Sequence, residues 1–269
     1  MLFLRKGYGC RPRFRVMYDL KGRVAVVTGS GRGIGRAIGL RFAREGCRVV
    51  FNARKRQDEL DESVDEARRL GAEAVGVLAD VSTAEGAGVL LQRALDSFGG
   101  VDILVNNAGI GIFTPFINAD EKLIERHLSS DFRSVVYTTR LFAQKMSDGG
   151  AILNISSIAG TQPMLGLSLY GAMKAAVNTL TRYLALELAP RLRVNAIAPG
   201  WVNTKLGRSM PELLGMSLED FAKRYTLMGR ILEPEDVAEM AVTTVRIESL
   251  TGQIIQIDSG ESILGFQRS

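Results

Sequence analysis

The chain has 269 residues, of which 46% are hydrophobic and 23% charged, as in a globular protein with one large domain or two small ones. Its formal net charge of +5 is concentrated in residues 1–16, which hold five basic side chains and no acidic one, so the remaining charge is balanced and argues against nucleic acid as a partner. Two cysteines with no neighbouring metal-ligand type argue against a disulfide-rich secreted domain and against a metal site.

The basic leader, residues 1–16, is interpreted as a disordered extension or as sequence before a working start at Met17, with a presequence or anchoring arm as alternatives. It lacks the order of a secretory signal, and no stretch is apolar enough to span a membrane. We therefore expect a cytoplasmic protein whose single domain covers residues 17–269.

Short apolar runs and amphipathic stretches alternate along this domain. The runs predict strands over 24–28, 49–52, 74–78, 103–106, 151–155, 194–197 and 254–257, and the amphipathic stretches predict helices over 34–45, 57–70, 83–98, 120–146, 169–188 and 235–246. Uninterrupted apolar strands are typical of a parallel sheet covered on both faces. The pattern predicts an α/β domain with one doubly wound sheet of about seven strands, and residues 201–232, which break the rhythm, as a substrate lid.

A glycine-rich turn joins the first predicted strand to the first predicted helix. Gly29, Gly33 and Gly35 fit a Thr-Gly-x-x-x-Gly-x-Gly spacing that begins at Thr28. Missing side chains let the backbone approach a pyrophosphate, whose charge the helix N-terminus stabilises. The context predicts a dinucleotide site, because the turn lies between a strand and a helix. The predicted site also includes the loop residues Ser30, Arg32 and Ile34.

The end of the second predicted strand indicates which dinucleotide fits. An acidic side chain there would hold the ribose hydroxyls of NAD and repel the 2′-phosphate of NADP. Residues 51–55 contain no carboxylate, and Arg54, Lys55 and Arg32 could converge on a phosphate, which favours NADP(H). If these are solvated surface charges, NAD(H) stays the alternative.

Tyr170 and Lys174 are the strongest candidates for catalysis. Their i, i+4 spacing places phenol and ammonium on one face of a helix. A nearby cation should lower the pKa of the tyrosine, so that it can act as acid toward a carbonyl or as base toward an alcohol. Ser157 follows a predicted strand, where parallel sheets place their ligands, and could share the substrate oxygen with Tyr170.

With these residues in place, the sequence resembles the short-chain dehydrogenase/reductase family, in the branch of 3-oxoacyl reductases and sugar dehydrogenases. The resemblance spans roughly residues 20–260 and rests on positions 28–35, 80–81, 106–109, 157, 170–174, 193–200 and 251–253. It implies a Rossmann fold and a homotetramer or dimer formed through the helices over 131–146 and 170–188. It also implies that Asp80 and Val81 hold the adenine, that Asn107 and Lys174 contact ribose, and that Pro199, Gly200, Val202 and Thr204 line the nicotinamide.

The chain departs from the family at Asp131, where an asparagine typically positions a proton-relaying water. An aspartate keeps an acceptor but loses the amide donor, and its charge would lie near Lys174. Either Asp131 supports the relay, or backbone and water do so alone. His127, the only histidine, lies one turn earlier, at the polar start of the same predicted helix. We expect it to be a surface residue, with membership of the relay as the weaker alternative.

These features predict an NADP(H)-dependent enzyme that interconverts a secondary alcohol and a ketone. The substrate is a 3-oxoacyl thioester or another hydrophobic ketone; a sugar dehydrogenase and a non-catalytic NADP(H)-binding subunit are the alternatives. An acidic carrier protein would need a basic rim, for which Arg191 and Arg208 are candidates. The pocket is expected to be built by residues 109–116, 160–169 and 201–231, although their apolar side chains would equally suit core or lid packing. These side chains are Ile110, Ile112, Phe113, Met164, Leu165, Leu167, Trp201 and Met210.

Overall fold

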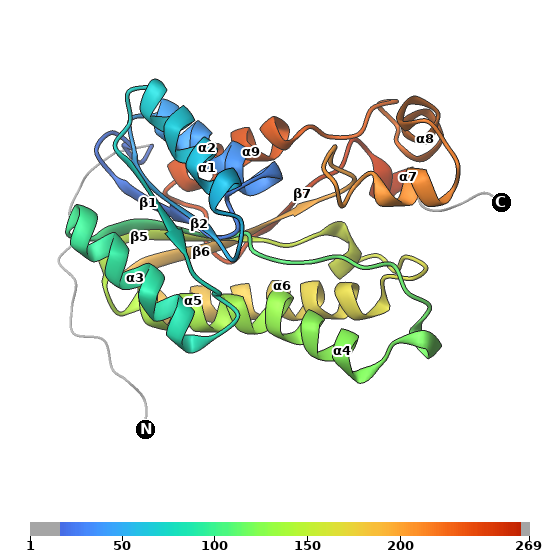
Figure 1. Ribbon diagram of the computed structural model, residues 1–269, viewed down its shortest axis with the longest axis horizontal. Helices are drawn as coiled ribbons and strands as arrows, with labels where there is room; N and C mark the ends of the chain where they lie inside the picture. Colours follow the sequence, from blue (N-terminus) through green and yellow to red (C-terminus); the bar gives the residue numbers. More distant parts are fainter. Residues whose placement is uncertain (1–16, 265–269) are drawn as a thin grey trace.

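The computed structural model describes residues 17–264, in which one parallel sheet lies between two layers of helices (Figure 1). The seven predicted strands are confirmed, and the sheet order is β3-β2-β1-β4-β5-β6-β7. The order reverses between β1 and β4, which is where open α/β sheets bind ligands. The predicted leader, residues 1–16, lies outside the described residues. The strands are β1 (Val24–Val27), β2 (Arg48–Ala53), β3 (Ala74–Leu78), β4 (Val101–Asn106), β5 (Met146–Ile155), β6 (Leu192–Pro199) and β7 (Ile254–Ile257).

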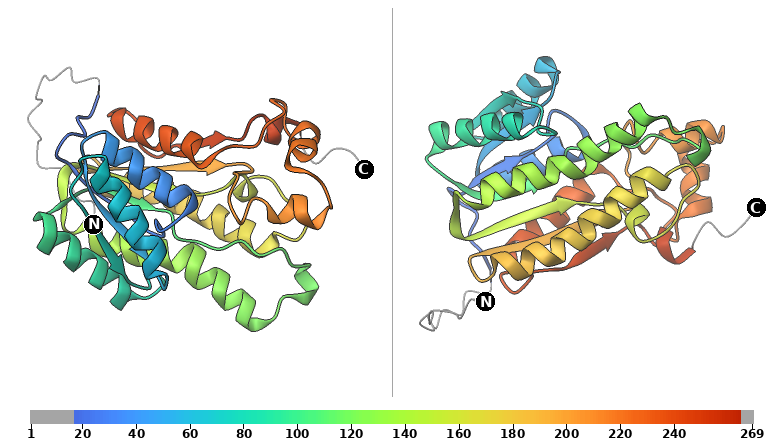
Figure 2. Two further views of the ribbon diagram at one scale, coloured as in Figure 1. Left: turned by 45° about the horizontal axis from the view of Figure 1, so that its top comes forward. Right: turned by 90° about the horizontal axis from the view of Figure 1, so that it is seen from below.

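Each face of the sheet is covered by three helices, and one apolar core lies on each side. Helices α1 (Gly33–Arg44), α2 (Gln57–Arg69) and α9 (Pro234–Arg246) cover one face. Helices α3 (Ala84–Phe98), α5 (Ser134–Ala143) and α6 (Ser168–Leu188) lie side by side on the other (Figure 2). Strand side chains such as Val27 and Val26 point alternately into the two cores, which explains why the strands are apolar throughout.

The predicted helix over 120–146 is interrupted. It consists of α4 (Glu121–His127), a π-helical segment η2 (Leu128–Arg133) and α5, and it ends before β5 begins at Met146. A π segment inserts extra residues into the helix and turns side chains to new directions, often at functional sites. Sequence periodicity could not reveal it, because both flanks remain helical.

Residues 201–232 form a separate small unit at one end of the sheet, which Figure 1 shows around α7 and α8. It contains α7 (Ser209–Leu213) and α8 (Leu218–Tyr225), which the periodicity did not predict because each is short. Trp201, Met210 and Phe221 form its own apolar cluster. The remaining short helices are η1 (Phe116–Asn118), η3 (Ile158–Gly160) and α10 (Glu261–Leu264). Within residues 17–264, no helix is long and apolar enough to cross a membrane.

Candidate active site

The predicted functional residues gather at the carboxyl ends of the strands. Gly29 follows β1, Arg54 follows β2, Asn107 follows β4 and Ser157 follows β5. Because all strands are parallel, these ends share one edge of the sheet. The fold therefore brings together residues that are far apart in the sequence.

The glycine-rich turn leads directly into the N-terminus of α1. Gly33 adopts φ +55°, which favours glycine, and a methyl group there would lie 3.5 Å from Cγ2 of Thr204. A side chain on Gly35 would overlap the Asn107 amide and the Gly29 carbonyl oxygen. The turn thus packs against the residues that follow β4 and places the N-terminus of α1, which favours an anionic group such as a pyrophosphate, close to Thr204.

Two of the predicted cofactor contacts have a structural role in this turn. The Ser30 hydroxyl is buried, donates to the Val27 oxygen at 2.7 Å and accepts from the Asn52 amide at 2.9 Å. Asn107 donates through Nδ2 to the carbonyl oxygens of Thr28 at 2.9 Å and Gly29 at 3.0 Å. These bonds hold the turn in position, and Ile34 packs against the neighbouring core.

The residues after β2 and β3 form the other end of the predicted dinucleotide site. Arg54 is half exposed, and its guanidinium reaches the Asp80 carboxylate only at 3.9 Å. Val81 is buried beside this carboxylate. Arg32 contacts Glu59 at 3.4 Å, so its charge is partly compensated. Arg54 is therefore the better placed of the two arginines to meet a phosphate.

Residues 199–204 form a wall opposite the glycine-rich turn, because Thr204 faces Gly33. Pro199 and Val202 are buried, and the Gly200 amide donates to the Ile257 oxygen at 2.9 Å. Thr204 folds back, so that its hydroxyl accepts from the Gly207 amide at 3.2 Å. A carboxylate that the sequence did not single out, Glu261 of α10, accepts from the Trp201 amide at 3.0 Å and fixes this wall.

Burial raises the pKa of Glu261, the hydrogen bond from the Trp201 amide lowers it and the nearby Asp258 raises it, which together bring this pKa to about 8. A raised folded-state pKa means that the proton stabilises the native state, and this contribution is lost as pH rises from about 4.5 to about 8. We expect Glu261→Gln to remove this loss, roughly 3–5 kcal/mol in total. Thermal melts from pH 5 to 9 should show the variant gaining on wild type as pH rises; a constant difference would contradict the assignment.

Tyr170 and Ser157 meet at the centre of the edge. Burial raises the pKa of Tyr170, the Asp131 carboxylate raises it further, and the neighbouring Ser157 hydroxyl lowers it, so the net shift is upward. The sequence predicted that Lys174 would lower the pKa of Tyr170. For the protein alone this prediction is wrong, because burial and Asp131 raise that pKa. The Ser157 oxygen also accepts from the Ala159 amide at 3.1 Å, which fixes the hydroxyl at the end of β5.

Lys174 lies behind Tyr170 on the same helix. Its Nζ is 5.5 Å from the centre of the Tyr170 ring and donates to the carbonyl oxygen of Ile155 at 2.9 Å. Burial lowers the pKa of Lys174, and the Asp131 carboxylate opposes this. The sequence could not predict the Ile155 contact, because it depends on how α6 packs against β5.

Asp131 lies in η2 and is completely buried, and its Oδ1 accepts from the Ile110 amide at 2.7 Å. The expectation that His127 lies on the surface is wrong: it is 1% exposed, and its Nδ1 is 2.7 Å from Asp131 Oδ2. The polar start of α4 suggested exposure, but the last turn of α4 packs against α6. The i, i+4 spacing of the two residues was the one signal in the sequence.

The three segments predicted to build the pocket meet above these residues. Leu206 lies against Gly111, and the Thr114 amide donates to the Gly166 oxygen at 2.9 Å. Phe113 stacks on Trp201 with 6.1 Å between ring centres. Trp201 and Met210 belong to the cluster of residues 201–232, so they support the pocket rather than line it openly, whereas Leu165 is 92% exposed.

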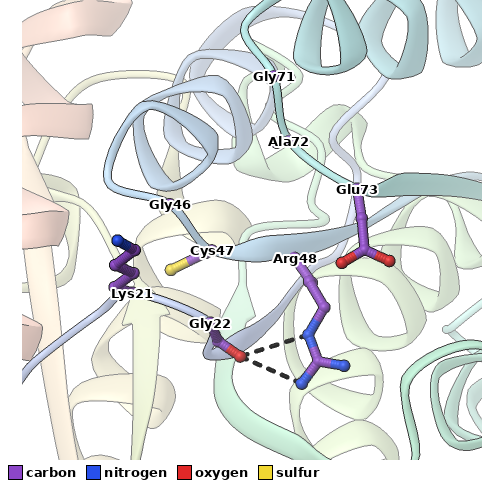
Figure 3. A pocket seen from close by; sticks show the side chains of 8 residues that line it. All are labelled: Lys21, Gly22, Gly46, Cys47, Arg48, Gly71, Ala72 and Glu73. Carbon is purple, nitrogen blue, oxygen red and sulfur yellow. Dashed lines mark hydrogen bonds between the residues drawn. The ribbon is translucent and has the colours of Figure 1, made fainter.

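Arg191 lies at the wrong edge for a carrier-protein rim. Its guanidinium donates to the backbone oxygens of Ala143 and Met146. These lie at the amino ends of β5 and β6, opposite the ends where the predicted functional residues gather. Arg208 lies within residues 201–232 and donates to Asn203 Oδ1 at 2.7 Å. A surface hollow at the same far edge is lined by residues at the starts of β1, β2 and β3, and the Arg48 guanidinium there donates to the Gly22 oxygen (Figure 3). It therefore lies away from the predicted functional residues, which follow the carboxyl ends of the strands.

Comparisons with known proteins cover almost the whole chain. A family model described as enoyl-(acyl carrier protein) reductase matches residues 29–262. A 3beta-hydroxysteroid dehydrogenase 1 from Eggerthella lenta is 38% identical over 260 residues, covering 93% of this chain and 98% of that protein. A short-chain dehydrogenase from Burkholderia cenocepacia in complex with NADP superposes with a TM-score of 0.85 at 30% identity, covering 91% of this chain and all of that one. A 7 alpha-hydroxysteroid dehydrogenase with NADH and a 7-oxo bile acid gives 0.84 at 32%, covering 90% and 95%.

Proposed function

The chain belongs to the short-chain dehydrogenase/reductase family, and we propose that it is an NADP(H)-dependent enzyme that interconverts a hydrophobic ketone and its secondary alcohol. The observation that carries this is the convergence of Tyr170, Ser157 and Lys174 at the edge of the sheet beside the glycine-rich turn. A non-catalytic binding subunit would not need this arrangement.

The dinucleotide is proposed to bind between the glycine-rich turn and residues 199–204. The N-terminus of α1 begins at this turn, and Gly33 carries no side chain toward Thr204. Asp80 and Arg54 lie toward the adenosine end, and Lys174 toward the reacting end. When bound there, a nicotinamide dinucleotide supplies or accepts the hydride.

The protein's own groups handle the proton. In reduction, Tyr170 donates its hydroxyl proton to the substrate oxygen, while Ser157 donates a hydrogen bond to the same oxygen. In oxidation, Tyr170 accepts the alcohol proton. Lys174, held by the Ile155 carbonyl, places an ammonium behind the phenol and favours the phenolate that remains after reduction. The Asp131 carboxylate acts on the charge of Lys174 and completes the proposed catalytic group.

Preference for NADP(H) is proposed from Arg54, since known relatives use either dinucleotide. We expect Arg54→Ala to raise KM for NADPH about tenfold and to leave KM for NADH unchanged, because a charge-assisted bond to the 2′-phosphate is lost. Arg56→Ala is the matched control, since Arg56 is exposed and paired with Asp58 at 2.6 Å. An unchanged ratio of the two KM values in Arg54→Ala would refute the preference.

A hydrophobic substrate is favoured by the surface around the site. Leu165, Leu206 and Leu213 of the pocket-forming segments are exposed. Exposed large apolar side chains near a site are consistent with an apolar ligand. Two relatives bear names of hydroxysteroid dehydrogenases, which supports a fused-ring ketone or alcohol over a sugar. A 3-oxoacyl thioester stays the second candidate, supported by the description of the family model.

The proposal is tested by a substrate panel. NADPH oxidation and NADP reduction are followed spectrophotometrically with oxo- and hydroxysteroids, 3-oxoacyl thioesters, diketones, simple secondary alcohols and sugars. The expected result is the highest kcat/KM with a fused-ring ketone or alcohol. Preference for sugars would overturn the substrate class, and absence of turnover together with tight NADPH binding would favour a binding subunit.

The proposed setting of the enzyme is a cytoplasmic homotetramer formed through α5 and α6. Leu186 on the outer side of α6 is 78% exposed, an unusual position for leucine unless a partner covers it. Cys47 is a buried free thiol, as suits a reducing compartment. We expect Leu186→Asp to reduce the mass measured by light scattering to that of a smaller assembly. An identical mass in wild type and variant would place the interface elsewhere.

A further inference from the structure

A buried imidazole and a buried carboxylate are paired directly behind the proposed catalytic residues. The side chains of His127 and Asp131 are 2% and 0% exposed, respectively, and their Nδ1 and Oδ2 atoms are 2.7 Å apart. Burying a carboxylate is costly unless both oxygens have partners. The backbone supplies one partner and His127 the other.

The two oxygens of Asp131 face different directions. Oδ2 faces His127, while Oδ1 accepts from the Ile110 amide at 2.7 Å. Oδ1 also borders the space beside Gly109, where an added methyl group would lie 2.7 Å from Oδ1 and 3.6 Å from Lys174 Nζ. Asp131 Oδ1 and Lys174 Nζ therefore both border the position that a side chain on Gly109 would occupy.

We propose that His127 is a positioning residue of the active site, which donates Nδ1–H to Asp131 Oδ2 and so holds Oδ1 toward Lys174. The inference rests on the proposed function, because that function places Lys174 behind the proton-transferring Tyr170. The imidazole fixes the rotation of the carboxylate, and the fixed carboxylate in turn orients and stabilises the buried ammonium. Histidine–carboxylate pairs orient reactive groups in this manner in other enzymes.

The charges around the pair agree with this arrangement. On α6, the Tyr170 ring lies against the His127 imidazole, with 6.4 Å between ring centres. Lys174 lies on the same helix as Tyr170. From η2 it faces Asp131, while on the outer side of α4 and η2 the Glu125 and Arg133 side chains are exposed and paired with each other. A neutral imidazole with its proton on Nδ1 leaves one negative charge on Asp131 to compensate the ammonium of Lys174.

A first experiment does not depend on turnover. Because His127 is the only histidine, ¹⁵N-histidine labelling of protein without a histidine tag gives a single imidazole in the NMR spectrum. We expect the neutral ring to carry its proton on Nδ1 in wild type and on Nε2 in Asp131→Ala. A wild-type ring protonated on Nε2 would overturn the inference, and this result is readable even if the whole substrate panel fails and the proposed function with it.

A second experiment separates positioning from packing. Asparagine can place an amide N–H near the position of Nδ1, whereas leucine cannot. We expect His127→Leu to lower kcat about 10–100-fold with little change in KM for NADPH, and His127→Asn to recover most of the loss. In the Asp131→Asn background, His127→Leu should add little, and Glu125→Gln on the same helix should match wild type. Equal kcat values in His127→Asn and His127→Leu, or full activity in His127→Leu, would refute the role; if His127→Leu does not fold, His127→Asn and the NMR spectrum decide.

Discussion

Replacing Tyr170 with phenylalanine is expected to lower kcat/KM by about 10²–10⁴-fold, because the substrate oxygen loses its proton donor and acceptor. This corresponds to roughly 3–5 kcal/mol of transition-state stabilisation. The ring stays in place on α6, so stability and NADPH affinity should change little. Steady-state kinetics with the best substrate of the panel measures the loss.

A matched control for this substitution lies on the same helix. Tyr183 is 61% exposed on α6, and Tyr183→Phe removes a hydroxyl far from the site. NADPH affinity can be followed through Trp201, the only tryptophan, which is buried at the start of residues 201–232 next to Gly200. Activity in Tyr170→Phe within a few-fold of Tyr183→Phe would exclude Tyr170 as the proton-transferring group.

Replacing Asp131 with asparagine is expected to shift the pH profile of the reaction toward lower pH. The Asp131 carboxylate raises the pKa of Tyr170, because a nearby negative charge disfavours the phenolate. Without that charge the pKa falls. Alcohol oxidation, which needs the deprotonated tyrosine, should then begin at a lower pH. Reduction, which needs the protonated tyrosine, should decline at correspondingly lower pH.

The charge of Asp131, and not its size, is the quantity tested. Glu125→Gln removes a carboxylate from the exposed side of α4 and should leave both profiles unchanged. Asp131→Asn also removes the charge that keeps the pKa of Lys174 from falling further, so rates at the plateau should be compared as well as midpoints. Superimposable pH profiles for wild type and Asp131→Asn would show that the carboxylate does not act on Tyr170.

The parts of the site that follow from local sequence were predictable. The spacing of Tyr170 and Lys174 is fixed by helix geometry, and the glycine-rich turn is recognisable because only particular positions tolerate its backbone. The strands could be located because a parallel sheet buried on both faces requires continuous apolar runs. Arg191 was misjudged for the opposite reason, since a charged residue in a loop gives no sign of the sheet edge that it will occupy.

The upward shift in the pKa of Tyr170 was also beyond the sequence, since it depends on burial and on Asp131, which approaches through the π segment. The same holds for the raised pKa of Glu261, whose hydrogen-bond donor, the Trp201 amide, is 60 positions away in the sequence. Such pairs form only when helices and loops pack, and their energies depend on the solvent that packing excludes.

By itself the sequence determined the seven-stranded parallel sheet and the glycine-rich turn, and it predicted Tyr170, Lys174 and Ser157 as reacting groups, because each follows from periodicity or spacing along one or two elements. Only the tertiary structure decided that His127 is buried, that its Nδ1 lies 2.7 Å from Asp131 Oδ2, and that Asp131 Oδ1 and Lys174 Nζ both border Gly109. The physical reason is that α4 packs on α6 while η2 rotates the following residues inward, and neither event leaves a signature in hydrophobic periodicity.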